Sequence, residues 1–237
     1  MPSQSELLWD LGLQDELAGI TKFCIHPGEM FRSKMRVGGT KNVNFEKIKN
    51  LQPDLIIANK EENKQEQVEE LMKHYPVWIS DIKNLDDALQ MIRSLGEITG
   101  KSENANSIAE NILASFSSFH PPDSRPRTAY IIWKDPLMAA GKNTFIDDML
   151  ARCGLQNIFT SSDRYPAVTF ETLRNLDPEL ILLSSEPYPF KEKHVAEFRA
   201  ACPKAKISLA DGEMFSWYGS RLLQAPACFS ALLHSIK

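Results

Sequence analysis

The sequence predicts an α/β protein built from two similar lobes joined by one long α-helix. Three observations predict this class. A helix–proline–strand unit occurs twice, at residues 44–58 and 169–183. Helical and strand patterns alternate in both halves of the chain, which is typical of mainly parallel sheets. One long helical pattern at 102–119 precedes the Pro-rich segment 120–126, and a lone helix makes a stiffer connector than a Gly/Ser linker.

The second copy of the repeated unit begins 125 residues after the first, and the two copies align without a gap. Asn44 and Thr169 occupy the N-cap position of its helix, where side-chain oxygens accept backbone N–H bonds. Pro53 and Pro178 end the helix, because proline cannot continue it, and the apolar run that follows predicts a buried strand. A chance match between two common units is the alternative. The agreement at one offset favours two similar lobes.

The first lobe is assigned by its patterns in chain order. We expect a helix at 3–13, a short strand at 18–21 and a loop at 22–39 before the first repeat copy. An acidic helix at 61–72, a strand at 76–79 and a helix at 84–96 follow. An α/β lobe normally places a strand before its first helix, and this sequence supplies none there.

The second lobe begins with a strand at 128–133 and a helix at 144–153, followed by the second repeat copy. A helix at 191–201, a strand at 207–209, an aromatic loop at 211–219 and a last helix at 219–236 complete it. The predicted boundaries are 1–100 for the N-terminal lobe, 101–124 for the connecting helix and linker, and 125–237 for the C-terminal lobe. A crevice between two lobes is a common place for small ligands to bind.

Composition limits the classes of protein. The chain has 237 residues, of which 43% are hydrophobic and 24% charged, and its net charge is −4. These values fit a globular protein and argue against a nucleic-acid partner, which needs clustered Lys and Arg. No apolar run approaches the ~18 residues that span a bilayer. Residues 1–6 lack the basic and apolar regions of a secretory signal. The four cysteines form no CxxC motif of a zinc or redox site.

Several stretches together carry a family resemblance: residues 2–8, 38–39, 44–58, 141–142 and Arg221 after the aromatic loop. With them, nearly the whole chain resembles the helical-backbone metal receptors, which are the substrate-binding components of ABC importers for vitamin B12, ferric siderophores and haem. The resemblance implies two Rossmann-like lobes and a binding protein, not an enzyme. It implies capture of a metal chelate (cobalamin or another corrinoid, a ferric siderophore or haem) in the inter-lobe cleft, with no cofactor of the protein's own. It also implies a monomer that docks on a dimeric ABC permease, and a periplasmic location.

The same resemblance predicts which residues line the ligand-binding cleft. Aromatic rings and Arg are typical of such sites, because the rings offer flat contact area and Arg pairs with carboxylates or phosphates. Four of the candidates named below also have a structural alternative. Trp217 and Tyr218 would then pack under the last helix, Trp78 would lie in the core, and Arg221 would anchor a helix. The histidines do not supply the three or four ligands of a bare metal ion, so we expect no metal site. The candidates are Ser3, His26, Gly39, Thr40, Asn59, Trp78, Trp133, Tyr165, Trp217, Tyr218 and Arg221.

Acidic residues follow the repeated strand in both halves. Glu61 and Glu186 are related by the offset of 125, and Glu66 and Glu192 are near-equivalents. In the resembled family, a Glu on each lobe docks on an Arg pocket of the permease, and two symmetric acids suit a two-fold partner. A solvated acidic helix face is the alternative for each of them.

Two rival functions stay open. A metal-cluster oxidoreductase-type domain has a related two-lobed architecture, but it needs cysteine ligands, and Cys24 alone is suitably placed in the sequence. No Walker A, GxGxxG or GxSxG motif indicates catalysis. A cytoplasmic chelate carrier or sensor without a permease fits the absence of a secretory signal, and neighbouring permease genes would separate it from an importer component.

Overall fold

The computed structural model describes residues 1–236 and shows the predicted α/β class. The chain forms two compact units, which are described separately below. Unit 1 comprises Met1–Ile82, Asp86–Ile112 and Trp217–Arg221. Unit 2 comprises the other described residues, chiefly Leu113–Ser216 and the segment from Leu222 onward. The 17-residue helix α6 (Ser102–Ser118) begins in unit 1 and ends in unit 2, so the two lobes are joined by one long helix, as predicted.

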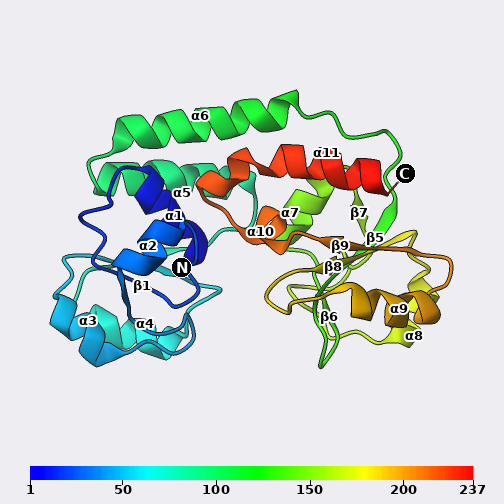
Figure 1. Ribbon diagram of the computed structural model, residues 1–237, viewed down its shortest axis with the longest axis horizontal. Helices are drawn as coiled ribbons and strands as arrows, with labels where there is room; N and C mark the ends of the chain where they lie inside the picture. The colour runs from blue at the N-terminus through cyan, green and yellow to red at the C-terminus, as the bar shows by residue number, and fades with distance from the viewer. Residues whose placement is uncertain (237) are drawn as a thin grey trace. The chain divides into compact units, whose positions relative to one another are not determined.

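Unit 1 alternates helices and short strands (Figure 1). Its strands pair in parallel, but they form two separate two-stranded sheets: β1 with β2, and β3 with β4. The elements are α1 (Pro2–Asp10), β1 (Gly19–Ile20), α2 (Gly28–Ser33), β2 (Met35–Arg36), α3 (Phe45–Leu51), β3 (Ile56–Asn59), α4 (Gln65–Met72), β4 (Val77–Ser80) and α5 (Leu85–Ile98).

The predicted loop at 22–39 is wrong in part, because it contains α2 and β2. Helix α2 was missed because it is only six residues long and buries one side chain, Met30, so it has almost no apolar periodicity. The acidic helix begins at Gln65 instead of residue 61. Residues 61 and 62 instead belong to a turn that the Asn59 side chain holds.

Helices α5 and α6 pack closely within unit 1. A Cβ built on Gly96 of α5 would lie 2.3 Å from the Cβ of Ala105 in α6, so the contact needs a glycine. Gly100 connects the helices with a φ of +68°, a conformation that glycine adopts at no steric cost. The apolar stripe of α5 is buried, including Ala88, Ile92 and Leu95.

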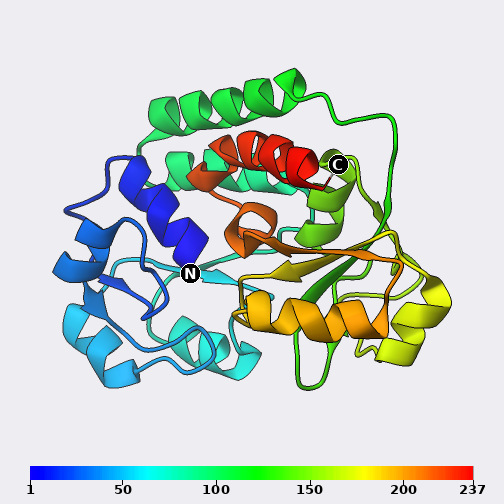
Figure 2. The same cartoon turned by 45° about the vertical axis from the view of Figure 1, so that its right-hand side comes forward.

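Unit 2 is a larger α/β sheet with the strand order β6-β5-β8-β9, and β7 also pairs with β5. Figures 1 and 2 both show α8 and α9 on one face of this sheet and α7, α10 and α11 on the other. All its strand pairs are parallel except β5 with β6. The elements are β5 (Arg127–Trp133), β6 (Met138–Ala139), α7 (Phe145–Arg152), β7 (Gln156–Asn157), α8 (Phe170–Leu176), β8 (Leu180–Ser184), α9 (Glu192–Ala201), β9 (Lys206–Ala210), α10 (Gly212–Ser216) and α11 (Ala225–Ser235).

The predicted loop at 211–219 is also wrong in part, because Gly212–Ser216 forms the short helix α10. Its Phe215 is fully buried, with ring centroids 4.8 Å from Phe229 and 5.1 Å from Tyr130. The predicted last helix is divided into a 3₁₀ turn at Ser220–Leu223 and α11. Pro226 lies at the start of α11.

The repeated unit has the same geometry in both copies. The Asn44 side chain accepts a hydrogen bond from Lys47 N at 2.9 Å, and Thr169 accepts one from Thr172 N at 3.0 Å. Each helix then ends at a residue in the left-handed region, Gln52 with φ 47° and Asp177 with φ 43°. The two copies are therefore alike in their caps as well as in their sequence.

We expect Asn44→Ala to lower the free energy of unfolding by about 1 kcal/mol, because it removes the N-cap bond of α3. Thr169→Ala should cost a similar amount at α8. Urea unfolding at neutral pH measures both. Asn50→Ala is the matched control, since Asn50 is exposed inside α3 and Ala is the better helix former there. A loss in the control equal to that of Asn44→Ala would contradict the capping account.

Candidate functional site

An aromatic and ionic cluster, here called the Trp217 cluster, joins Glu6, His26, Trp217 and Arg221 in unit 1. Arg221 donates from Nε to Glu6 Oε2 at 2.8 Å and from Nη2 to Glu6 Oε1 at 2.5 Å. Its guanidinium carbon lies 4.8 Å from the centroid of the Trp217 ring. The His26 ring meets Trp217 edge-on, with centroids 5.9 Å apart. Both charged side chains are only 11–12% exposed, so the ion pair is largely desolvated.

Backbone packing fixes this cluster against α1. A Cβ built on Gly219 would lie 2.5 Å from the carbonyl oxygen of Ser3, so only glycine fits there. The Ser220 hydroxyl donates to the Asp10 carboxylate. Ser3 is buried at 4% exposure. The structure therefore brings together four predicted residues, Ser3, His26, Trp217 and Arg221, at one place in unit 1.

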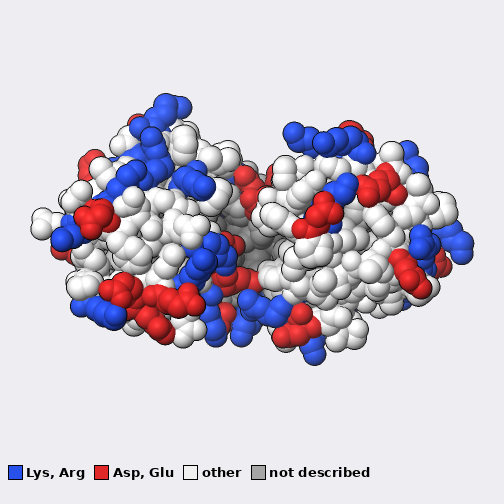
Figure 3. Space-filling view, turned by 90° about the horizontal axis from the view of Figure 1, so that it is seen from below, with Lys and Arg blue, Asp and Glu red and all other residues white. Residues whose placement is uncertain are grey.

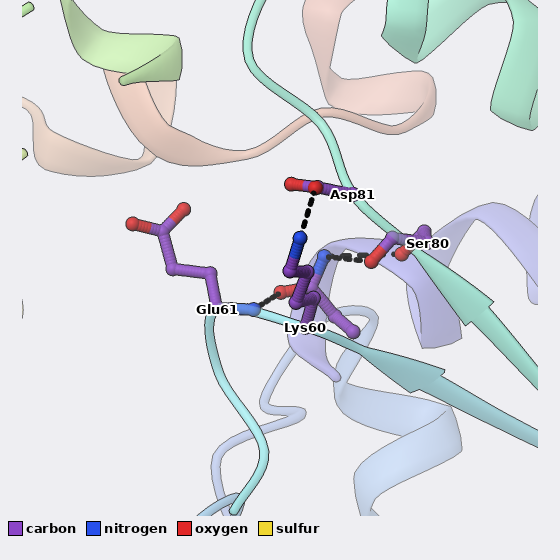
Figure 4. Close-up of polar contacts among 5 residues, drawn as sticks. Lys60, Glu61, Ser80 and Asp81 are labelled. Atoms are coloured by element: carbon purple, nitrogen blue, oxygen red, sulfur yellow. Dashed lines mark hydrogen bonds and ion pairs between the residues drawn. The ribbon is translucent and has the colours of Figure 1, made fainter. Parts of the chain in front are cut away.

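A second group of polar residues forms where β3 and β4 end (Figure 4). Asn59, only 1% exposed, donates to the Ser80 hydroxyl at 3.0 Å and accepts from the backbone N–H groups of Glu61 and Glu62 at 3.0 Å each. Lys60 pairs with Asp81 at 2.9 Å. Figure 4 shows the Glu61 side chain extending away from this pair. The Asn59 amide thus sets the turn that presents Glu61.

Thr40 lies beside the same turn. Its carbonyl oxygen accepts from Asn63 Nδ2 at 2.9 Å, and its side chain hydrogen-bonds Glu62. Burial raises the pKa of Glu62 above its ordinary value of 4.5, although Lys41 opposes the shift. Burial also raises the pKa of Tyr218 well above its usual range, and Glu62 and Glu61 add to that shift. Tyr218 and Thr40 therefore both lie near this half-buried acidic turn.

Glu62→Gln is expected to stabilise the protein at pH 7 by about 0.5 kcal/mol. The folded state holds the Glu62 pKa above its unfolded value. Stability from this group is therefore present below the unfolded pKa and is lost as the pH rises through the folded pKa. The gain should be absent at pH 3.5, where both states are protonated. Chemical unfolding at the two pH values measures it, with exposed Glu66→Gln as the control. An equal gain at both pH values would contradict the assignment.

The other predicted ligand residues are more scattered. Trp78 is half-buried within β4, opposite Ile57, and Gly39 is buried before Thr40. In unit 2, Trp133 ends β5 and is 38% exposed; its indole donates to the Asp135 carbonyl at 3.0 Å and its ring lies 5.8 Å from Tyr188. Tyr165 is half-buried in the loop after β7. Ligand contact by these residues stays a prediction.

The four candidate docking residues differ in setting. Glu66 and Glu192 are exposed in the first turns of α4 and α9. Glu61 and Glu186 are half-buried, and Glu186 accepts from the Ser216 hydroxyl at 2.5 Å. On the face shown in Figure 3, acidic and basic side chains both occur over each unit.

Sequence reasoning missed Glu6, Glu62 and Asn63. Glu6 pairs with a residue 215 positions away, and no local signal predicts such a contact. Asn63 was detectable in principle: an Asn that follows a strand end by four residues is well placed to hold the turn, and its Oδ1 accepts from Asn59 N at 2.8 Å.

Cys24, the cysteine that a metal-cluster enzyme would use, is fully buried and within 3.3 Å of the Ser5 hydroxyl and 3.1 Å of the Thr21 hydroxyl. Among the described residues, no group of three or more His, Cys, Asp or Glu side chains is placed to hold a metal ion.

Within residues 1–236, no helix has both the length and the apolar character needed to cross a membrane.

A family profile described as "Periplasmic binding protein" matches residues 1–202. The chain belongs to this family. The vitamin B12-binding protein of Pectobacterium atrosepticum is 24% identical over 246 residues, covering 100% of this chain and 87% of the relative. The family resemblance inferred from the sequence is thus confirmed.

Solved structures of this family share the fold. The periplasmic heme-binding protein RhuT from Roseiflexus sp. RS-1, in apo form, has a TM-score of 0.83 at 18% identity, covering 99% of this chain and 96% of RhuT. The periplasmic vitamin B12 binding protein BtuF of Vibrio cholerae has a TM-score of 0.79 at 20% identity, covering 100% and 95%. The predicted fold class is confirmed.

Proposed function

We propose that this periplasmic binding protein captures a metal chelate and delivers it to the permease of an ABC importer. A corrinoid is the first candidate, and haem and ferric siderophores are the others. The observation that carries the proposal is the full-length match of this family member to a vitamin B12-binding protein. The heme-binding RhuT, with the same fold, supports chelates as the ligand class.

Aromatic surface near the ends of strands supports the proposal. Trp133 offers the face of a large ring that is 38% exposed, and His26 lies half-buried against Trp217. Such rings give flat contact area at little entropic cost. In the proposal, Trp133 contacts the chelate directly, while the Glu6–Arg221 pair holds Trp217 and His26 in place.

Titration of the purified protein with cyanocobalamin, haem and ferric siderophores tests ligand capture. We expect one chelate class to raise the melting temperature saturably and to shift the absorbance spectrum. Trp133→Ala should weaken that binding at least tenfold, whereas Leu113→Ala, at another exposed apolar side chain of unit 2, should not. Absence of a shift with every chelate would contradict the proposed function. Equal weakening by both variants would contradict the role of Trp133.

Docking on a permease is proposed through Glu66 and Glu192, with Glu61 and Glu186 beside them. The first two are exposed and begin equivalent helices of the two units. We expect Glu66→Lys with Glu192→Lys to abolish chelate uptake into cells and leave chelate binding unchanged. The matched control is Glu46→Lys with Glu171→Lys, because these exposed acids begin α3 and α8 in the same symmetric way. Unchanged uptake in the docking variant would favour a chelate carrier that needs no permease.

A further inference from the structure

His194 lies in the first turn of α9 and is surrounded by aromatic side chains of unit 2. Its side chain is only 6% exposed. The ring centroids of Tyr188 and Phe190 lie 5.6 and 5.5 Å from that of His194, and both rings meet it edge-on. A histidine in this setting has little access to water, so its charged form is disfavoured there.

The hydrogen bonds of the His194 ring require its neutral form. Lys191 N, at the N-cap of α9, donates to His194 Nδ1 at 2.9 Å, so that nitrogen carries no proton. The ring proton of a neutral histidine is then on Nε2, which lies 3.4 Å from the Tyr188 hydroxyl and donates to it. His194 therefore satisfies an N–H group at the start of α9, as a capping-box side chain does, and holds Tyr188 at the same time.

The charges around His194 act in the same direction on balance. Burial is the main cause that lowers the pKa of His194 below its ordinary value of 6.5. Lys134, just after β5, and Lys193, on α9, lower this pKa further, whereas Glu197 of α9 raises it. Glu197 is already paired with Lys134 at 2.6 Å. A cation in the first turn of a helix is also unfavourable because of the helix dipole.

Tyr188 connects this histidine to the exposed ring of Trp133. The Trp133 and Tyr188 rings meet edge-on, with centroids 5.8 Å apart. Tyr188 N also donates to the carbonyl oxygen of Ile132 at 3.3 Å, so the Tyr188 backbone is bonded to β5 directly before Trp133. Trp133 therefore packs on a side chain whose own position depends on His194.

We propose that His194 is a pH-sensitive positioning residue, which holds Tyr188 against Trp133 only while its ring is neutral. A proton on Nδ1 replaces the acceptor of Lys191 N with a second donor, so the cap of α9 is lost. Tyr188 then loses its partner, and the Trp133 ring loses its support. These contacts all lie within unit 2 and need no ligand. The consequence for chelate capture rests on the proposed function, in which Trp133 contacts the chelate.

The sign of the pH dependence follows from linkage. The folded state binds a proton at His194 less readily than the unfolded chain does. Stability from this group is therefore present above the unfolded pKa and is lost as the pH falls through the folded pKa. His194→Gln should remove this dependence, because glutamine at the third position of a helix also accepts the N-cap N–H and does not titrate in this range.

The first measurement compares melting temperatures at pH 8 and pH 5. We expect the wild-type chain to lose ~3 °C more than His194→Gln over this interval. His120→Gln is the matched control, because His120 is an exposed histidine of unit 2, and it should lose as much as the wild type. Equal losses in the wild type and in His194→Gln would overturn the proposal.

The second measurement follows Trp133 directly, with 5-fluorotryptophan in the chain and the Trp133 signal identified by Trp133→Phe. We expect this fluorine signal to shift with a midpoint below pH 6.5 in the wild type and in His120→Gln, and to stay constant in His194→Gln. A wild-type signal that does not change with pH would overturn the proposal.

Histidine ring ¹⁵N spectra of the wild-type chain decide the matter if His194→Gln does not fold. A proton on Nδ1 of His194 at neutral pH, or a titration midpoint at or above 6.5, would overturn the proposal. Chelate affinity is read separately, and we expect the wild-type dissociation constant to be roughly threefold higher at pH 5 than at pH 8. Chelate binding without any pH dependence would overturn the link between His194 and capture. If no chelate binds, the proposed function fails, while the fluorine signal still decides the role of His194.

Discussion

Replacing Arg221 by Met is expected to lower the free energy of unfolding by about 3 kcal/mol. Arg221 holds the Glu6 carboxylate with two hydrogen bonds of 2.8 and 2.5 Å, and both side chains are nearly buried. Without its partner, the Glu6 charge stays in a site with little access to water, and the Trp217 ring loses its cation. Urea unfolding at neutral pH measures the loss.

A double-mutant cycle separates anchoring from ligand contact. Glu6→Gln combined with Arg221→Met should cost clearly less than the sum of the single variants, because the pair acts as a unit. Lys60→Met is the matched control, since the Lys60–Asp81 pair is exposed and such pairs contribute less than about 1 kcal/mol. If Arg221→Met costs no more than the control yet weakens chelate binding, Arg221 is a ligand group and not an anchor.

Phe215→Ala should be the most destabilising single change in the aromatic segment, at about 4 kcal/mol. Its side chain has no exposed surface and packs between Phe229 and Tyr130, with ring centroids 4.8 and 5.1 Å away. Removing the ring leaves a cavity under α11 that the surrounding rings fill only in part. Thermal and urea unfolding measure the effect.

Trp133→Ala is the control for that change. Trp133 is also aromatic and also in unit 2, but it is 38% exposed. We expect it to cost less than about 1.5 kcal/mol and to act mainly on chelate binding. Equal stability losses in the two variants would show that exposure does not separate structural from ligand-facing rings here.

Local features of the chain were predictable where one short stretch holds all the information. The N-caps Asn44 and Thr169 formed the expected bonds, because a cap depends on residues three positions apart. The strands after Pro53 and Pro178 formed for the same reason: proline ends one element and the apolar run begins the next. The two-lobed class followed from the recurrence of this unit.

The candidate site was less predictable because its contacts join distant parts of the chain. Glu6 and Arg221 are 215 positions apart, and nothing near either residue indicates the pairing. Helix α10 was missed because five residues are too few for a helical period, and its Phe215 is held by tertiary contacts to Tyr130 and Phe229. The division of unit 1 into two sheets depends on which strands meet, which no single stretch encodes.

The segment Trp217–Arg221 has a consequence for dissecting the protein. It belongs to unit 1, although the chain before and after it belongs to unit 2. A fragment that stops at Ile112 would therefore contain Glu6 without the arginine that neutralises it, and α1 without the glycine that packs on Ser3. Neither half of the gene should yield an autonomous domain. The two halves should regain a native spectrum only when they are refolded together, as in a fragment-complementation pair.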